Sequence, residues 1–278
     1  MTSNTVVFIT GCTGNGIGYH LSKTFHAAGC RVFVSGRNAA KMNHIGEGVE
    51  FVQLDVTSPE SVQNAIQQVE AKAGKIDILV NNAGQGCVGP LAEVQLDRVK
   101  STFDTNVFGL LSVTQAASVG MIQRRSGLIV NISSIVSHVP TPWAGVYCAT
   151  KACVTSMSDV LRMELAGFNI KIMCVFPGAI RSSIGDANAA AFRPKEKSAY
   201  KNVVDQILAR ASWSQCPQST PAEELAGEIV ANALRSEPPA SLSAGYRSYR
   251  AWWSYYLPRS ARDYLWGSQF GIDKVGKV

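Results

Sequence analysis

The sequence has few charged residues and few metal-binding side chains. Only 17% of its 278 residues are Asp, Glu, Lys or Arg, it has four histidines, and no two of its seven cysteines form a Cys-x-x-Cys pair. No long run of Lys or Arg occurs, which argues against nucleic-acid binding despite a net charge of +6. The scattered, odd set of cysteines predicts reduced thiols, with neither disulfides nor a metal site.

Long apolar runs are also lacking. We find no stretch that approaches the ~18 apolar residues of a membrane span. Met1 to Asn4 lead directly into a short apolar segment without a signal-peptide pattern, which predicts a cytoplasmic protein. With 46% hydrophobic residues, the chain nevertheless has enough apolar side chains for a full core.

Short, nearly continuous apolar segments alternate with longer amphipathic ones. The apolar segments are typical of strands buried on both faces; they cover residues 6–9, 31–35, 51–54, 76–80, 128–132 and 170–175. Helix signals lie between them, including Ser58-Pro59 at a helix start, Gly74 at its end, and a capping box at Thr220 to Glu223. This alternation predicts an α/β fold, a Rossmann-type doubly wound parallel sheet with helices on both faces.

A glycine-rich loop follows the first predicted strand and begins a helix. It reads Thr10-Gly11-Cys12-Thr13-Gly14-Asn15-Gly16-Ile17-Gly18. Glycines allow the backbone to turn tightly and approach a pyrophosphate, and the helix N-terminus offers free N–H groups to the anion. A glycine-rich turn without a ligand is the alternative, but the position in a strand–loop–helix unit favours a dinucleotide.

The charge after the second strand indicates which dinucleotide binds. An acidic residue ~20 positions after the glycines would hold the ribose 2′-hydroxyl of NAD. No Asp or Glu occurs between Gly11 and Gly46, whereas Arg37 and Lys41 follow the second strand. Because arginine pairs bidentately with phosphate, we expect NADPH; a solvated surface arginine is the alternative.

Tyr147 and Lys151 form a second signal. Residues four apart lie on one face of a helix. A neighbouring ammonium favours the phenolate, so Lys151 is expected to lower the pKa of Tyr147 from its usual value of about 10. Such a pair alone is more often an ordinary packed helix face, but Ser133-Ser134 and Asn81 to Gly84 end predicted strands, where open α/β sheets bind ligands. Asn106, a poor helix former inside a helical pattern, marks a backbone distortion or a buried water.

Together these motifs resemble the classical short-chain dehydrogenase/reductase family. The matching segments occur in the family's order between residues 5 and about 235: Thr10-Gly11 with Gly16-Ile17-Gly18, Asp55-Val56, Asn81-Asn82-Ala83-Gly84, Asn106 to Gly109, Asn131 to Ser134, Tyr147 with Lys151, and Pro177-Gly178. The resemblance implies an NADPH-linked oxidoreductase that acts on C=O or CH–OH groups and assembles as a dimer or tetramer.

The resemblance also implies roles for individual residues. Ser134 would polarise the substrate carbonyl, Tyr147 would donate the proton, Lys151 would lower the pKa of Tyr147 and hold the nicotinamide ribose, and Asn106 would position a water that relays protons. Further residues would bind the cofactor: Gly11, Thr13, Asn15, Gly16, Ile17, Gly18, Arg37, Asp55, Val56, Asn82, Ala83, Gly84, Pro177, Gly178, Ile180 and Ser182.

Two details differ from the family's common pattern. The glycine loop is one residue longer, which affects the contacts of Thr13 to Asn15, and Ser182 stands where threonine is common. The loop that begins Thr-Gly-Cys, Cys30 to Arg37, and Pro177 to Ser182 are similar to the NADPH-dependent 1-acyldihydroxyacetone-phosphate reductase-like branch, which also includes ketoreductases of secondary metabolism.

The chain is interpreted as one catalytic domain, residues 1–239, with an irregular substrate lid at 182–217 and an aromatic, basic extension at 240–278. Tyr249, Trp252, Trp253 and Tyr256 recur there at helical spacing among arginines. They pack over the cleft or a partner subunit, or else contact a membrane surface peripherally; packing is the more common case.

Three classes of function remain open from the sequence. The leading one is an NADPH-dependent ketoreductase for a hydrophobic, polyketide-type ketone. The alternatives are a 1-acyldihydroxyacetone-phosphate reductase of lipid synthesis and an isomerase, epimerase or cyclase that returns the hydride or uses only the pocket. A non-catalytic scaffold on the same fold is disfavoured because Tyr147 and Lys151 are both present.

Overall fold

Seven parallel strands form one sheet at the centre of the molecule. The computed structural model describes residues 4–38, 46–182 and 192–277. The strand order is β3-β2-β1-β4-β5-β6-β9, so the direction of winding reverses between β1 and β4. The strands are β1 (Val6–Ile9), β2 (Arg31–Gly36), β3 (Val49–Gln53), β4 (Ile78–Asn81), β5 (Gly127–Ile132), β6 (Ile170–Pro177) and β9 (Ser241–Ala244). The predicted Rossmann-type fold is confirmed.

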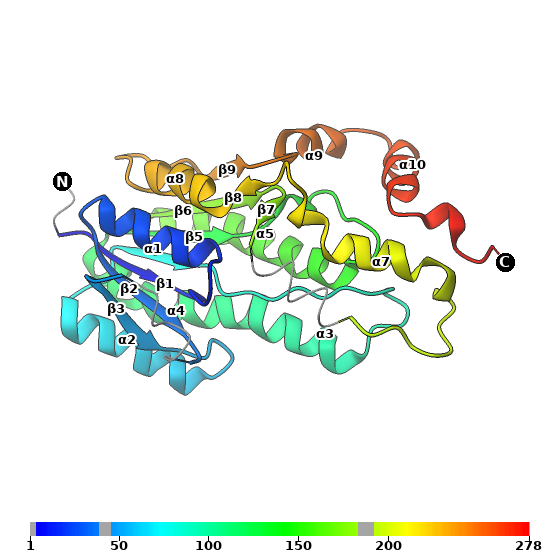
Figure 1. Ribbon diagram of the computed structural model, residues 1–278. Coiled ribbons are helices and arrows are strands. Elements are labelled where there is room, and N and C mark those ends of the chain that lie inside the picture. Colours follow the sequence, from blue (N-terminus) through cyan, green and yellow to red (C-terminus); the bar gives the residue numbers. More distant parts are fainter. Residues whose placement is uncertain (1–3, 39–45, 183–191, 278) are drawn as a thin grey trace.

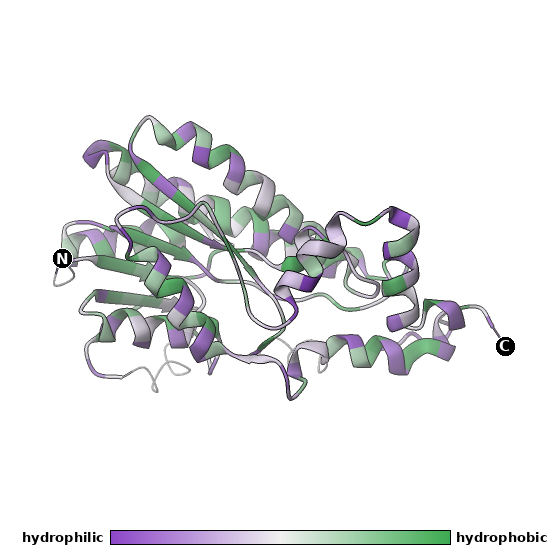
Figure 2. Ribbon diagram, turned by 90° about the horizontal axis from the view of Figure 1, so that it is seen from above, coloured by the Kyte–Doolittle hydropathy of each residue, from purple (hydrophilic) through white to green (hydrophobic). Residues whose placement is uncertain are grey.

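Helices cover both faces of this sheet (Figure 1). Side chains of α1 and α8 pack on one face, and side chains of α2, α4 and α5 pack on the other. Figure 2 shows the central strands as predominantly hydrophobic, whereas hydrophilic and hydrophobic residues alternate along the helices. The helices are α1 (Ile17–Ala27), α2 (Pro59–Ala73), α3 (Leu96–Phe103), α4 (Leu110–Arg124), α5 (Gly145–Ala166) and α8 (Ala222–Ala233).

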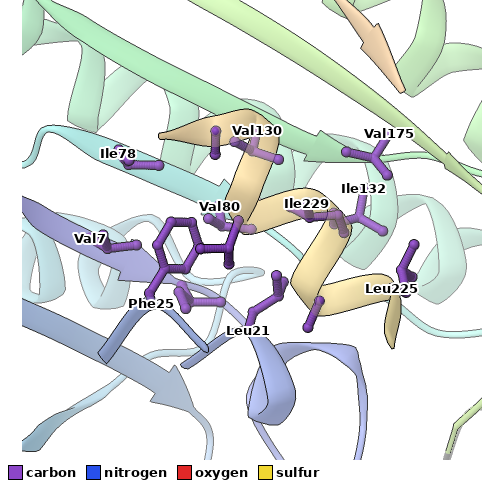
Figure 3. Close-up of a cluster of buried hydrophobic side chains, with 14 of the residues drawn as sticks. Val7, Leu21, Phe25, Ile78, Val80, Val130, Ile132, Val175, Leu225 and Ile229 are labelled. Carbon is purple, nitrogen blue, oxygen red and sulfur yellow. The ribbon is translucent and has the colours of Figure 1, made fainter. Parts of the chain in front are cut away.

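The core between the sheet and helices α1 and α8 fixes the start of α1. Leu21 and Phe25 of α1 and Ile229 of α8 are fully buried against the strands. In Figure 3 these side chains meet the strand residues in one apolar cluster. Burying side chains of this size stabilises the fold by roughly 1.5–3 kcal/mol each. This packing holds the glycine loop, which lies directly before α1, at the carboxyl end of β1.

The predicted helix signals are confirmed in one case and wrong in another. Ser58 caps α2 by accepting a hydrogen bond from the backbone N–H of Ser61, and Gly74 ends this helix in the left-handed conformation. The capping box at Thr220 is not formed: α8 begins after Pro221 without a side-chain cap. The Thr220 hydroxyl instead accepts a hydrogen bond from the backbone N–H of Tyr246 at 2.9 Å, because Thr220 lies in the short strand β8 (Thr220–Pro221).

Strand β9 was not expected from the sequence. It pairs in parallel with β6 and completes the edge of the sheet, although it lies within the segment expected to be an extension. With only Leu242 as a large apolar residue, Ser241 to Ala244 lacks the apolar run that marks the other strands. The sheet therefore extends past residue 239, and the division of the chain at that point stays a proposal.

One helical stretch bears on the question of membrane spans. Leu96–Arg124 is long and apolar enough to pass the length and composition criteria for a membrane-spanning helix, but 61% of its most apolar window is buried inside the protein. It consists of α3 and α4 joined by a π-helical turn, Asp104–Gly109. Asn106 lies in this turn, so the predicted distortion of the helix at this asparagine is confirmed.

The remaining elements lie beyond the carboxyl ends of the strands. They are β7 (Ile180–Arg181), α7 (Val204–Ala211), α9 (Ser248–Tyr255) and α10 (Arg259–Gln269). Figure 1 shows α7 beside the beginning of α5, with α10 and the C-terminus further out on the same side. Residues 183–191 of the predicted lid and Lys41, the basic residue after Arg37, lie outside the described residues.

Candidate active site

A cleft runs along the carboxyl ends of the central strands, where the winding of the sheet reverses. One half is lined by the glycine loop and by the ends of β2, β3 and β4, and the other half by β5, α5, β6 and α7. Ile17, Asn82, Gly84 and Ser182 line both halves, which makes the cleft continuous. Ligands of open α/β sheets bind at such a switch point.

The glycine loop approaches the β4 end closely. Gly11 has φ +72°, and a Cβ at this position would lie 2.5 Å from Cα of Ala83. A Cβ on Gly18 would lie 2.6 Å from Nδ2 of Asn82. A side chain at Gly11 would require a backbone shift, and a side chain at Gly18 would displace the Asn82 amide group. Both glycines therefore favour the contact between the loop and the β4 end.

Thr10 and Asn82 lock this contact with hydrogen bonds. The Thr10 hydroxyl oxygen accepts bonds from the backbone N–H groups of Asn82 and Ala83, both at 3.0 Å. In return, Nδ2 of Asn82 donates to the carbonyl oxygens of Thr10 and Gly11 at 2.9 and 2.8 Å. Asn82 is therefore used to hold the loop as well as to line the cleft.

Arg37 lines the same half of the cleft, directly after β2. It is exposed after β2, and its guanidinium group has no hydrogen-bond partner in the described ranges of the chain. Asp55 lies on the same wall. Burial alone raises the pKa of Asp55, but two hydrogen bonds from Thr57 and the charge of Arg37 together lower it. The cleft thus presents a free guanidinium group where the sequence analysis places a phosphate.

Ser134 and Tyr147 meet in the other half of the cleft. Ser134 follows β5, and Tyr147 lies in the first turn of α5, which begins at Gly145. Their side chains interact through a hydrogen bond that lowers the pKa of Tyr147. Ser133 also lines the cleft, but its hydroxyl is bonded to the carbonyl oxygen of Lys151 at 3.1 Å and to the hydroxyl of Thr155 at 2.9 Å. Of the two serines, Ser134 is thus the one that faces Tyr147.

The pKa of Tyr147 differs from the sequence expectation. It is raised to about 12, because burial of the phenol is the largest effect and the neighbouring Cys148 raises it further. The charge of Arg210 and the hydrogen bond with Ser134 oppose this rise without overcoming it. Lys151, which we expected to lower this pKa, does not reverse the effect of burial. At neutral pH Tyr147 therefore carries its proton.

Lys151 is a buried ammonium group one helical turn after Tyr147. Its Nζ donates a hydrogen bond to the carbonyl oxygen of Ile132 at 2.8 Å and lies 5.7 Å from the centroid of the Tyr147 ring. Burial lowers the pKa of Lys151 to about 8, while Cys174 opposes this shift. A Cβ on Gly84 would lie 3.7 Å from this Nζ, so the absence of a side chain there keeps the space beside the ammonium group open.

Asn106 lies behind the cleft and does not line it. Its Oδ1 accepts a hydrogen bond from the backbone N–H of Gln85 at 2.8 Å, and its Nδ2 donates to the Gln85 carbonyl oxygen at 2.9 Å and to the Thr150 hydroxyl at 3.0 Å. The π-helical turn thereby connects the β4 end to the residue preceding Lys151. No hydrogen bond joins Asn106 and Lys151 directly in the described part of the protein.

Most of the sequence-predicted residues lie together in this cleft. The structure places these at its walls: Gly11, Thr13, Gly16, Ile17, Arg37, Asp55, Val56, Asn82, Ala83, Gly84, Ser134, Tyr147, Lys151, Pro177, Gly178, Ile180 and Ser182. Three do not line it, namely Asn15, Gly18 and Asn106. Sequence reasoning missed Arg210 and Trp213, which enter from α7 and the segment after it, because no motif surrounds them.

Comparison with known proteins gives a consistent family. A family model described as short chain dehydrogenase matches residues 5–191. The short-chain dehydrogenase cctT of Talaromyces islandicus is 31% identical over 274 residues, which cover 97% of this chain and 96% of that protein. The NADPH-dependent 1-acyldihydroxyacetone phosphate reductase of Schizosaccharomyces pombe is 33% identical over 186 residues, 66% of this chain and 62% of the other.

A solved structure supports the same relationship along the whole chain. A short-chain dehydrogenase from Streptomyces avermitilis superposes with a TM-score of 0.80 at 27% sequence identity, and the match covers 100% of both chains. The similarity therefore includes the segments after residue 191, which the family model does not reach.

Proposed function

The chain belongs to the short-chain dehydrogenase family and is an oxidoreductase, and from this premise we propose that it is an NADPH-dependent ketoreductase. The substrate is a ketone carried by a hydrophobic small molecule. The observation that carries this proposal is the continuous cleft, which places Ser134, Tyr147 and Lys151 next to a glycine-loop site. Apolar side chains of β5, α5 and β6 form much of the substrate half.

The residues of the glycine-loop half fit a nicotinamide dinucleotide. Gly11 and Gly16 line this half, and Gly16 directly precedes α1, whose N-terminus suits a pyrophosphate. Asp55 and Val56 would flank the adenine, Asn82 to Gly84 the adenosine ribose, and Pro177, Gly178, Ile180 and Ser182 the nicotinamide. When bound, the cofactor supplies the hydride that reduces the carbonyl.

The preference for NADPH rests on Arg37. Its guanidinium group is exposed, lines the cleft and has no hydrogen-bond partner in the described ranges, so it is available to a 2′-phosphate. The name of the Schizosaccharomyces pombe relative, an NADPH-dependent reductase, supports the same choice.

In the reaction, Ser134 and Tyr147 bind the substrate carbonyl oxygen, and Tyr147 donates the proton to it. The raised pKa of Tyr147 suits this direction, because the phenol is protonated near neutral pH. Lys151 would hold the nicotinamide ribose through its Nζ when the cofactor is bound. Asn106 acts as a positioning residue that holds Gln85 and Thr150 through hydrogen bonds. In the proposed reaction it would position a water that relays protons to Lys151.

Two further functions stay open within the same fold. The Schizosaccharomyces pombe relative favours reduction of a 1-acyldihydroxyacetone phosphate. An isomerase, epimerase or cyclase would use the same cleft without net consumption of NADPH. The test is to incubate the purified protein with NADPH and a panel of ketones, including an acyldihydroxyacetone phosphate, and to follow NADPH absorbance. Stoichiometric oxidation with a ketone supports the proposal; product formation without oxidation supports hydride return.

The assembly and location of the protein are also proposals. Exposed apolar side chains on the helix stretch before and within α4 and on α5, namely Phe108, Val119, Val160 and Met163, suit contact with a second copy of the chain. The exposed aromatics of α9, Tyr249, Trp252 and Trp253, lie beside Arg250 and suit peripheral contact with a lipid surface. We propose a cytoplasmic homo-oligomer that reaches such surfaces through α9.

A further inference from the structure

Arg210 is a cation in the substrate half of the cleft. It lies near the end of α7 and lines the same cavity as Ser134 and Tyr147. Its Nε and Nη2 both donate to the hydroxyl oxygen of Thr141, at 3.1 and 3.0 Å. Its guanidinium carbon lies 5.6 Å from the ring centroids of Trp213 and of Phe270. One hydroxyl and two aromatic rings therefore fix the position of the guanidinium group.

No acidic side chain neutralises this charge in the parts of the chain that the structure describes. None of the ion pairs there includes Arg210, and no Asp or Glu lines the cavity. Burial lowers the pKa of Arg210, while Cys148 and Tyr147 oppose this shift. The pKa values of both these groups are themselves raised, so neither supplies a negative charge at neutral pH. Arg210 is partly buried. Removing a charge from water without a counter-ion costs free energy, so arginines in such positions are normally paired.

The guanidinium group keeps hydrogen-bond donors for a ligand. A guanidinium carries five N–H donors in a planar fork, and only Nε and Nη2 are used, both on the same oxygen. Nη1 has no hydrogen-bond partner within the described ranges. A planar fork of this kind matches the two oxygens of a carboxylate or phosphate.

We propose that Arg210 binds an oxyanion carried by the substrate, a carboxylate or a phosphate on the same molecule as the ketone. This inference rests on the proposed reduction of a ketone at Ser134 and Tyr147, and it narrows the substrate class. The oxyanion supplies the counter-ion that Arg210 lacks, and the apolar walls of the cleft hold the rest of the molecule. Thr141 is a positioning residue for the guanidinium group.

A different role for Arg210 has a different kinetic signature. The charge of Arg210 lowers the pKa of Tyr147, so its removal also alters the proton donor. An effect through Tyr147 changes the rates of all ketones alike, since every substrate needs the proton. An oxyanion subsite instead changes the discrimination between charged and neutral ketones.

The experiment compares three matched ketones: p-acetylbenzoate, p-acetylphenyl phosphate and the neutral methyl p-acetylbenzoate. NADPH oxidation gives kcat/KM for each with the wild-type protein and with Arg210→Met and Arg210→Lys. We expect the wild type to prefer a charged ketone by about tenfold or more. Arg210→Met should bring the ratio of kcat/KM for the charged ketone to kcat/KM for the neutral ketone close to one. Arg210→Lys should retain part of this preference. Which charged ketone is preferred distinguishes carboxylate from phosphate.

Two controls separate the subsite from a change in net charge or in folding. Arg235→Met removes the same charge from an exposed position outside the cleft and should leave the ratio unchanged. Thr141→Val removes the acceptor that orients Arg210 and should reduce the ratio, while Thr141→Ser restores it. The oxyanion subsite would be overturned if Arg210→Met lowered kcat/KM equally for all three ketones, or if the wild type showed no preference for a charged ketone.

Calorimetric titration of p-acetylbenzoate into the protein saturated with NADP⁺ distinguishes failure of this inference from failure of the proposed function. If no ketone is reduced but Arg210→Met abolishes binding, the ketoreductase proposal fails and the oxyanion subsite stands. If ketones are reduced but binding and kcat/KM are insensitive to the charge of the ligand, the subsite is wrong and the ketoreductase proposal stands.

Discussion

The hydroxyl of Ser133 donates a hydrogen bond to the backbone carbonyl of Lys151 at 3.1 Å. This bond fastens the end of β5 to α5 one turn after Tyr147. The adjacent Ser134 carries no such bond to α5 backbone, and its hydroxyl instead interacts with the phenol of Tyr147. Two neighbouring serines of the same strand end therefore serve different purposes, one structural and one directed into the cleft.

The two serines should respond differently to removal of their hydroxyls. Ser134→Ala is expected to lower kcat for ketone reduction by about 10²–10³-fold, because a donor to the developing oxyanion is lost. Ser133→Ala is expected to reduce kcat less and to lower the free energy of unfolding by about 1 kcal/mol, because its bonds to α5 are lost. Steady-state kinetics and thermal unfolding of both variants check this. A larger loss of kcat in Ser133→Ala would reverse the assignment.

Arg37 should determine the choice between NADPH and NADH. Arg37→Ala is expected to weaken NADPH binding by about 10–100-fold and to leave NADH binding nearly unchanged, because only NADPH carries the 2′-phosphate. Fluorescence titration of both cofactors measures the two dissociation constants. Arg31→Ala is a matched control, because Arg31 pairs with Glu50 outside the cleft. An equal effect of Arg37→Ala on both cofactors would contradict the proposed phosphate contact.

Lys151 should destabilise the ligand-free protein at neutral pH. Its pKa falls from 10.5 to about 8 on burial, so the folded state binds the proton less tightly than the unfolded chain does. The cost of burying the ammonium group is complete below pH 8, decreases as the pH rises from about 8 to 10.5, and is absent above 10.5.

Lys151→Met should abolish turnover, because the proposed contact with the nicotinamide ribose is lost. It should nevertheless raise the Tm of the ligand-free protein at pH 7, by roughly 2–4 °C for each kcal/mol by which the cost of burying the ammonium group is reduced. The difference in Tm from the wild type should shrink between pH 8 and 10.5. Thermal unfolding over this pH range measures it. A variant that is less stable than the wild type at every pH would show that the bond from Lys151 to Ile132 outweighs the cost of burial.

Local motifs made much of the site predictable. The glycine loop, the strand ends and the four-residue spacing of Tyr147 and Lys151 depend on short segments, and the structure brings them into one cleft. Asn106 marked a real distortion, because an asparagine that bonds Gln85 and Thr150 stabilises the π-helical turn through contacts absent from an ordinary helix.

Features that depend on distant contacts were not predictable. β9 is held by its pairing with β6 rather than by its own apolar pattern. The hydroxyl of Thr220 does not cap α8, because it accepts a hydrogen bond from the backbone N–H of Tyr246. The pKa of Tyr147 is set by burial, which sequence spacing does not report, and Arg210 reaches the cleft only through the packing of α7.

In the proposed reaction, Tyr147 gives its proton to a ketone that receives hydride from NADPH. Tyr147→Phe is expected to lower kcat by about 10²–10⁴-fold, because the general acid is lost, while NADPH binding persists. Tyr249→Phe removes a hydroxyl from an exposed ring on α9 and serves as the matched control.

The most direct measurement follows deuterium from NADPH labelled at the transferable position of the nicotinamide. We expect one deuterium on the carbinol carbon of the product and one NADP⁺ formed per ketone reduced by the wild type. Tyr147→Phe should bind the labelled cofactor and transfer almost none of the label. Label transfer at the wild-type rate in Tyr147→Phe, or a product without deuterium from the wild type, would contradict the account.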